Sequence, residues 1–176
     1  FVGPPLDQTF IKFGVPEDKA KEAIQVFRSR YVVTGKFENY PYPGICQALQ
    51  QLKDQGHRLF VATSKPEHFA KQILKHFALA EYFEVICGAP MDEKAHSTKT
   101  TVIADALNRG NVTDLTDVVM VGDREHDVHG ATENGIPCIS VTWGYRTRAF
   151  HEGMGVVNLA DTPDELDALV HDPDIR

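Results

Sequence analysis

The sequence predicts an α/β fold, with a doubly wound parallel sheet and a small separate group of helices near the N-terminus. Two patterns lead to this prediction. Between residues 44 and 143, short apolar runs alternate with segments of helical periodicity, which is typical of parallel strands covered by helices on both faces. Residues 7–34 read instead as two helices with no strand between them. We therefore expect two domains of unequal size, at residues 1–38 and 39–176.

Four runs in the larger part have the composition of buried strands, because they are short, rich in β-branched or aromatic residues, and apolar at their centres. The predicted strands are residues 57–63, 82–87, 117–123 and 137–143. The predicted helices that alternate with them are residues 44–56, 67–79, 97–110 and 127–135. Glycines stand where three of these helices should end, at Gly56, Gly110 and Gly135.

Composition limits the possible partners. The net charge of -7 argues against a nucleic-acid backbone as the main partner, and no apolar run approaches the ~20 residues of a membrane-spanning helix. The N-terminal residues do not have the pattern of a signal peptide. Cysteine is rare and never paired in sequence, so we expect reduced cysteines and a cytoplasmic location. The three are Cys46, Cys87 and Cys138.

Polar residues follow the strand predicted at 57–63. Thr63, Ser64 and Lys65 come directly before Pro66, which precedes a helix. A hydroxyl group and free backbone N–H groups at such a turn can hold a phosphate oxygen. The simpler interpretation is that Ser64 only helps to begin the helix.

A second cluster follows the strand predicted at 117–123. Asp123 and Asp127 are separated by three residues, and Gly122 allows the backbone to turn sharply before them. Carboxylates at the end of a parallel strand suit Mg²⁺, which prefers oxygen ligands. Asp127 could instead be only a favourable charge at a helix N-terminus. Zinc is less favoured, because the cluster offers only two imidazoles, His126 and His129.

Lys99 stands in the first turn of the helix predicted at 97–110. A cation opposes the helix dipole there, so the position makes sense only if an anion lies opposite. The alternative is an ordinary solvent-facing lysine. From the dipole alone, we expect Lys99→Ala to stabilise the protein slightly.

In the order in which they occur, these clusters resemble the haloacid dehalogenase superfamily of phosphohydrolases. "VATSKPEHFAKQIL", "STKTTVIADAL" and "MVGDREHDVHGATENGI" are similar to the second, third and fourth motifs of that superfamily. "FVGPPL" and "YPGI" resemble its phosphoglycolate phosphatase-like members. "GDREHD" and "VTWGYRTRAF" are most similar to the bacterial 5′-nucleotidase branch.

The resemblance implies a Mg²⁺-dependent phosphatase that acts on a small phosphorylated metabolite or nucleotide. By position, Thr63 would bind the transferring phosphoryl group, and Lys99 would pair with that group and with the nucleophilic carboxylate. Asp123 would ligate Mg²⁺. Asp127 would either bind the metal through water or orient Lys99. Residues 1–38 would be part of a helical cap.

The first motif of the superfamily, a strand that ends in Asp-x-Asp-x-Thr and carries the nucleophile, is not found in these 176 residues. "DLTD" at 114–117 does not qualify, because it precedes a strand. We therefore expect the core to lack its first strand, which the resemblance places between 57–63 and 117–122. These two strands should not pair directly. The chain alone should not be a stable monomer, and a strand from another chain could fill the gap.

Two other functions compete with this hypothesis. The chain could be a catalytically inactive member of the superfamily that binds a phosphate ligand or a protein. A flavodoxin-like or receiver domain would also place acidic residues at strand ends. That third hypothesis explains neither the helices at 7–34 nor the "TSKP" turn.

Overall fold

The computed structural model describes residues 6–90 and 97–175, which form two compact units divided after Tyr40. The smaller unit is helical, as predicted for residues 7–34. It contains α1 (Leu6–Lys12), α2 (Ala20–Val33) and the short 3-10 turns η1 (Glu17–Lys19) and η2 (Gly35–Phe37). Phe27 joins its two helices, because its ring lies edge-on to Phe10 and stacks on Tyr31 at centroid distances of 6.1 and 5.7 Å. Most of "FVGPPL" lies outside the described residues.

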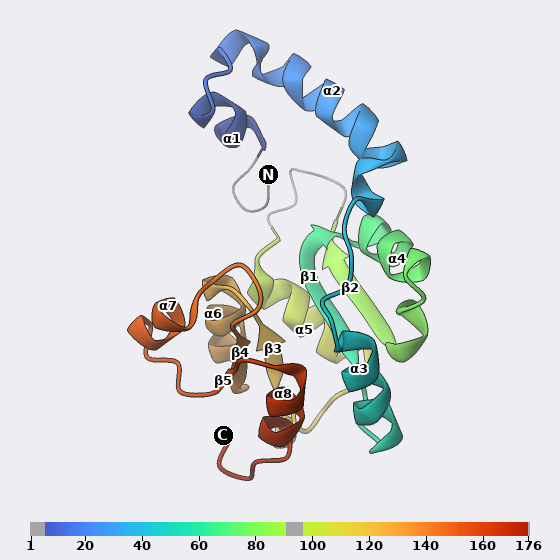
Figure 1. Cartoon of the computed structure of the whole chain (residues 1–176), viewed down its shortest axis with the longest axis vertical. Helices are drawn as coiled ribbons and strands as arrows, with labels where there is room; N and C mark the ends of the chain where they lie inside the picture. The colour runs from blue at the N-terminus through green and yellow to red at the C-terminus, as the bar shows by residue number, and fades with distance from the viewer. Residues whose placement is uncertain (1–5, 91–96, 176) are drawn as a thin grey trace. The chain divides into compact units, whose positions relative to one another are not determined.

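The larger unit, which begins at Pro41, is an α/β structure in which every described strand pairing is parallel. Its strands are β1 (Phe60–Pro66), β2 (Val85–Ala89), β3 (Met120–Gly122), β4 (Cys138–Val141) and β5 (Leu159–Ala160). Its helices are α3 (Ile45–Asp54), α4 (Glu67–His76), α5 (Lys99–Arg109), α6 (Glu125–Glu133), α7 (Arg148–Gly153) and α8 (Pro163–Val170), with a 3-10 turn η3 (Ala80–Tyr82) (Figure 1). The predicted α/β class is confirmed.

The described strands form two sheets, with the orders β1-β2 and β3-β4-β5. Strands β1 and β3 therefore do not pair with each other in the described part of the chain, as predicted. The Leu59 carbonyl accepts a hydrogen bond from Glu84 N–H at 2.9 Å, so it faces β2. Because successive residues of a strand face opposite edges, the Ala62 carbonyl faces the edge of β1 that has no strand beside it among the described residues. Val121 of β3 is 38% exposed, which is unusual for a residue inside a parallel strand.

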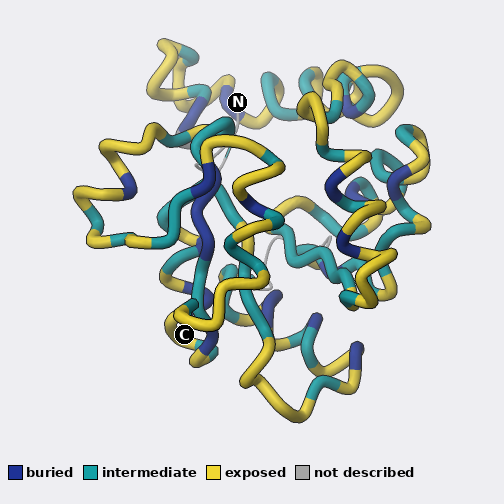
Figure 2. The backbone as a smooth tube through the Cα atoms, turned by 60° about the horizontal axis from the view of Figure 1, so that its bottom comes forward, coloured by how far each residue is buried: buried dark blue, intermediate teal, exposed yellow. Residues whose placement is uncertain are grey.

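Helix α5 connects the two sheets. Val102 and Ala106 pack with Cys87 of β2, while Ile103 packs with Ala131 of α6 and with residues of β1 and β3. Strand β4 is buried at three of its four residues, and Figure 2 shows how buried, intermediate and exposed stretches alternate along the backbone. The core thus reaches from one sheet to the other through the two faces of α5.

Three helices end close to the glycines at which their ends were predicted. Gly56 and Gly135 follow α3 and α6 with φ of 91° and 70°. Gly110 caps α5 with φ of -78°, and the left-handed residue is Asn111 with φ of 52°. A side chain at Gly110 would meet the Phe60 ring at 2.6 Å, so this glycine is needed for close packing.

Strand β1 ends later than predicted, at Pro66 rather than residue 63. Its register against β2 shifts between Thr63 and Pro66, which indicates an irregularity of the β-bulge kind. Ser64 does not cap α4, because Pro66 is the N-cap residue and no side chain bonds there. The interpretation of Ser64 as a helix-starting residue is therefore wrong. No helix in residues 6–90 and 97–175 is long and apolar enough to cross a membrane.

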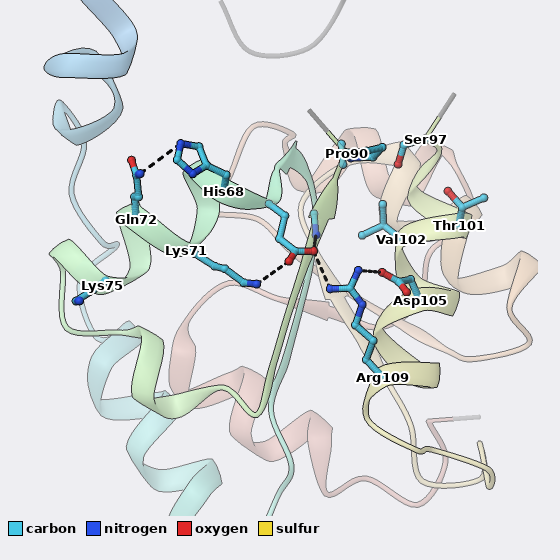
Figure 3. A pocket seen from close by; sticks show the side chains of 13 residues that line it. His68, Lys71, Gln72, Lys75, Pro90, Ser97, Thr101, Val102, Asp105 and Arg109 are labelled. Carbon is cyan, nitrogen blue, oxygen red and sulfur yellow. Dashed lines mark hydrogen bonds and ion pairs between the residues drawn. The ribbon is translucent and has the colours of Figure 1, made fainter. Parts of the chain in front are cut away.

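An ion-pair network lies beside β2 and connects α4 with α5. The Glu67 carboxylate contacts Lys71 Nζ at 2.6 Å and an Arg109 guanidinium nitrogen at 2.8 Å, and Arg109 also binds Asp105 at 2.6 Å. Glu67 further accepts a hydrogen bond from Gly88 N–H of β2 at 3.4 Å. Figure 3 labels Lys71, Asp105 and Arg109 of this network. Because Glu84 N–H faces β1, Gly88 N–H lies on the same edge of β2, beside the irregular end of β1, and Glu67 supplies its hydrogen-bond partner there.

We expect Glu67→Gln to lower the free energy of unfolding of the full-length protein by about 1 kcal/mol at pH 7. Burial alone would raise the pKa of Glu67, but the hydrogen bonds from Lys71 and Arg109 outweigh it and hold that pKa below its usual value. A lowered pKa stabilises the fold above the usual carboxyl pKa, and this stabilisation is lost as the pH falls through the lowered value. The free energy of unfolding, measured with urea, should therefore differ less between the wild type and Glu67→Gln at pH 3 than at pH 7.

Glu84→Gln is the matched control for this prediction, because Glu84 also forms an arginine pair at 2.8 Å, with Arg58, but both side chains are about half exposed. This control should change stability less than Glu67→Gln. Equal effects of the two variants at both pH values would contradict a special role of the network.

Candidate functional site

Lys99 and Asp127 form a buried ion pair at the start of α5. Lys99 Nζ lies 2.8 Å from Asp127 Oδ1, and the two side chains are 13% and 7% exposed. The same Nζ donates a hydrogen bond to the Ala62 carbonyl at 2.9 Å. Thr98 caps the helix just before Lys99 and forms a capping box with Thr101. The anion that the position of Lys99 requires is therefore present, and it is the Asp127 carboxylate.

Both oxygens of Asp127 are occupied by protein donors. While Oδ1 contacts Lys99, Oδ2 accepts hydrogen bonds from the backbone N–H groups of Asp123 and Arg124, each at 3.1 Å. Gly122 allows this contact, because a side chain at that position would overlap Asp127. Of the two roles considered for Asp127, orientation of Lys99 has its contacts in place.

Asp123 lies at the end of β3 and is held on one side. Its Oδ2 accepts a hydrogen bond from Tyr145 N–H at 2.8 Å. Gly144 packs against it so closely that a side chain there would overlap the Asp123 carboxyl group. Among the described residues, no donor bonds to Oδ1. Asp123 thus has a fixed orientation and one oxygen that remains open to a ligand.

This donor set fits Mg²⁺ through a single carboxylate. Mg²⁺ is commonly held by one or two carboxylates, with waters and substrate phosphate completing its six ligands. Asp123 could be such a ligand, whereas both oxygens of Asp127 already have protein donors, so a contact of Asp127 with the metal through water stays a prediction. His126 and His129 are exposed on α6 and are not part of any three-ligand group in the described residues, so the structure gives the zinc hypothesis no support.

One group of three potential metal ligands lies elsewhere, beside the pocket drawn in Figure 3. Single ligand atoms of Glu67, Cys87 and Asp105 lie within 4.8 Å of one another. The Arg109 guanidinium already binds both carboxylates, and burial raises the pKa of the Cys87 thiol to about 11. At neutral pH these atoms therefore form a closed ion-pair network rather than a metal site.

Thr63, Ser64 and Lys65 lie at the carboxyl end of β1. The Thr63 hydroxyl oxygen accepts a hydrogen bond from Lys65 N–H at 3.1 Å, which shapes the end of the strand. Ala62, next to Thr63, contacts Lys99 directly. The structure therefore brings this segment close to Lys99, Asp127 and Asp123, while the Ser64 and Lys65 side chains are exposed.

The sequence did not assign roles to the residues that hold Asp123. Gly144, Tyr145 and Arg146 belong to "VTWGYRTRAF", and Glu125 belongs to "GDREHD". Both segments contributed to the family resemblance, but nothing in the sequence showed that they touch. Burial, and secondarily the nearby Tyr145 and Asp123, raise the pKa of Tyr42 above its usual value.

A family model described as "Haloacid dehalogenase-like hydrolase" matches residues 1–141 of the chain. A 5′-nucleotidase from Pseudomonas aeruginosa is 40% identical over 146 residues, which are 82% of this chain and 65% of that protein. The tyrosine-protein kinase PtkA from Mycobacterium tuberculosis is 42% identical over 168 residues, which are 94% of this chain and 56% of that protein. The chain therefore spans less than two thirds of the length of these two relatives.

A crystal structure of a predicted phosphatase from Clostridium acetobutylicum resembles the fold closely. It has a TM-score of 0.82 and 43% sequence identity, and the match covers 96% of this chain and 77% of that chain. Similarity of this extent includes both the helical unit and the α/β unit. The superfamily resemblance and the fold predicted from the sequence are both confirmed.

Proposed function

Because the chain belongs to the haloacid dehalogenase-like hydrolase family, we propose that it is part of a Mg²⁺-dependent phosphatase of small phosphate monoesters. The observation that supports this most strongly is the arrangement of Lys99, Asp127 and Asp123. A buried cation and a half-open carboxylate lie together at the carboxyl ends of parallel strands, where such folds bind their ligands.

Each residue has a distinct proposed task. Lys99, oriented by Asp127, would neutralise charge on the phosphoryl oxygens and on the attacking carboxylate. The Thr63 hydroxyl would donate a hydrogen bond to the same phosphoryl group, with Ser64 and Lys65 nearby at the substrate. Asp123 would hold Mg²⁺, which, when bound, supplies further charge neutralisation.

The proposed nucleophile is an aspartate on a further strand between β1 and β3. Its carboxylate would attack phosphorus and expel the alcohol, and water would then hydrolyse the aspartyl-phosphate. Two observations support a strand at this place. The Ala62 carbonyl faces this edge and is contacted by the Lys99 side chain rather than by a strand, and Val121 is exposed although it lies within β3. The 176 residues contain no Asp-x-Asp-x-Thr sequence.

We propose that residues 1–38 are part of a cap that shields the site and selects the substrate, and that residues 39–176 are the catalytic core. The expected ligand is a phosphorylated metabolite or nucleotide rather than nucleic acid or a membrane. The proposed location is the cytoplasm, since the cysteines are few and unpaired.

A second candidate function is phosphoryl transfer from a nucleotide to a tyrosine. It is favoured by the similarity to PtkA, which covers more of this chain than the similarity to the 5′-nucleotidase does. The two functions differ in the acceptor of the phosphoryl group, which is water in one and a phenol oxygen in the other. The same Lys99 and Asp123 would serve both.

We expect the full-length protein to hydrolyse a nucleoside 5′-monophosphate faster than 2-phosphoglycolate in the presence of Mg²⁺. This expectation rests on "GDREHD" and "VTWGYRTRAF", and on the 40% identity to a 5′-nucleotidase. The measurement is kcat/KM for a panel of nucleoside monophosphates and 2-phosphoglycolate, by release of inorganic phosphate. A parallel reaction with ATP and a tyrosine peptide tests the kinase candidate.

Faster turnover of phosphoglycolate than of every nucleotide would reverse the substrate preference but keep the phosphatase. Phosphotyrosine formation without hydrolysis of any monoester would favour the kinase. If neither reaction is seen, calorimetry with inorganic phosphate would decide whether the protein only binds a phosphate ligand.

A further inference from the structure

The loop of residues 142–147, which connects β4 with α7, is fastened to the beginning of α6. Its principal contact is the pairing of Arg146 with Glu125, in which Nε and one terminal nitrogen each reach a different carboxylate oxygen, at 3.0 and 2.8 Å. Arg124 adds a third contact to Glu125 at 3.2 Å. These hydrogen bonds, that from Arg146 first, hold the pKa of Glu125 far below its usual range. The loop is therefore held to α6 mainly by this two-point contact.

The geometry of this pair restricts the loop more than an ordinary surface ion pair would. A planar guanidinium that meets both oxygens of a carboxylate fixes direction as well as distance. The Arg146 guanidinium also lies 4.5 Å from the centre of the Phe150 ring, so one of its faces is packed against an aromatic ring. Glu125 is only 22% exposed.

The neighbours of Arg146 are the residues that hold Asp123. Tyr145 N–H donates to Asp123 Oδ2 at 2.8 Å, and Gly144 lies against the Asp123 carboxyl group with no space for a side chain. Because Arg146 is the next residue along the chain, its contact with Glu125 keeps Gly144 and Tyr145 in position against Asp123. Without that anchor, the Asp123 carboxylate would be free to rotate about its side-chain bonds.

We propose that Glu125 and Arg146 are positioning residues, which fix the 142–147 loop and through it the metal-binding orientation of the Asp123 carboxylate. The metal-binding part of this inference rests on the proposed function. Neither residue touches the phosphoryl group in this proposal. Partners that orient a metal ligand in this way commonly change metal affinity by about 10- to 100-fold when removed.

This arrangement also explains why two separate segments carry the same resemblance. Glu125 stands in "GDREHD" and Arg146 in "VTWGYRTRAF", twenty-one positions apart. Arg146 gives Glu125 a two-point charged partner, and Arg124 adds a single contact. The two segments are therefore one physical unit formed around Asp123.

Arg146→Ala in the full-length protein tests the proposal, and Arg148→Ala is its matched control. Arg148 also makes a two-point contact with a carboxylate, that of Asp161, at 3.2 and 2.8 Å, but it lies on α7 and does not contact Asp123. Mg²⁺ affinity is measured by calorimetry without substrate, and kcat and KM at several Mg²⁺ concentrations. Arg146→Ala should raise the Mg²⁺ Kd about tenfold and lose activity chiefly at low Mg²⁺. Arg148→Ala should change neither quantity.

Glu125→Gln and the double variant complete the design. If the pair acts as a unit, Glu125→Gln should raise the Mg²⁺ Kd as Arg146→Ala does. The Kd of the double variant should then be only slightly higher than that of either single variant. Arg146→Lys keeps the charge but loses the two-point contact, so its Mg²⁺ Kd should lie between those of the wild type and Arg146→Ala.

A readout without metal separates this inference from the proposed function. The Tyr145 amide hydrogen should exchange with solvent at least tenfold faster in Arg146→Ala than in the wild type, with no such change in Arg148→Ala. Faster exchange in Arg146→Ala, together with a wild-type protein that does not bind Mg²⁺, would support the positioning of Asp123 and refute the metal role. Unchanged exchange and unchanged Mg²⁺ affinity in Arg146→Ala would overturn the inference.

Discussion

Asp123→Asn is expected to remove Mg²⁺-dependent phosphatase activity from the full-length protein, with a loss in kcat of about a hundredfold or more. Asn has nearly the shape of Asp, and its carbonyl oxygen can still accept the Tyr145 N–H bond that Asp123 Oδ2 accepts at 2.8 Å. The charge on the open oxygen is what disappears. The measurement is hydrolysis of a chromogenic phosphate ester across a range of Mg²⁺ concentrations.

Asp117→Asn is a suitable control for this experiment. Asp117 is exposed and precedes β3, on the same stretch of chain, and it lies at the opposite end of that strand from Asp123. It should retain wild-type activity. Turnover of Asp123→Asn near the wild-type value would refute the assignment of Asp123 to the metal.

Lys99→Ala should have the second large effect, and it should affect both activity and stability. Loss of the cation at the phosphoryl group should lower kcat by about 10²–10³-fold. The variant also leaves Asp127, whose side chain is 7% exposed, without its ion-pair partner at 2.8 Å. Breaking a buried pair from one side costs about 3 kcal/mol or more, so the midpoint of urea unfolding should fall.

The stability change expected from the helix dipole alone is therefore wrong in sign. The dipole argument considered only Lys99 and its own helix, whereas the structure adds Asp127 and the Ala62 carbonyl as partners. A double variant, Lys99→Ala with Asp127→Ala, tests this point. It should recover part of the lost stability but none of the activity. A single variant that is both stable and active would make Lys99 an ordinary surface residue.

Much of the fold could be predicted because local patterns determine it. The helix predicted at 97–110 is Lys99–Arg109, and the strand predicted at 137–143 is Cys138–Val141. The C-terminal elements were not predicted, since β5 has only two residues, Leu159–Ala160, and offers no periodicity to detect. The late end of β1 depends on its irregular register against β2, which is a tertiary contact.

The positions of the candidate site residues on the strands and helices could be predicted from the sequence, but their contacts could not. The spacing of Asp123 and Asp127 behind an apolar strand indicated two acids near a ligand. It could not show that Asp127 is occupied by Lys99 and by two backbone N–H groups, while Asp123 keeps an open oxygen. That distinction depends on Gly144 and Tyr145, which lie about twenty residues further along the chain and reach Asp123 only in the folded structure.

Both described sheets pair strands that are neighbours in sequence: β1 with β2, and β3 with β4 and then β5. Contact between them passes through α5, because Val102 and Ala106 pack with Cys87 of β2 while Ile103 packs with Ala131 and Ile136. The Lys99–Asp127 pair bridges the same contact, since Lys99 belongs to α5 and Asp127 to α6. Any local opening that separates α5 from α6 would therefore break the candidate site as well, so the lifetime of this helix contact sets the lifetime of the site.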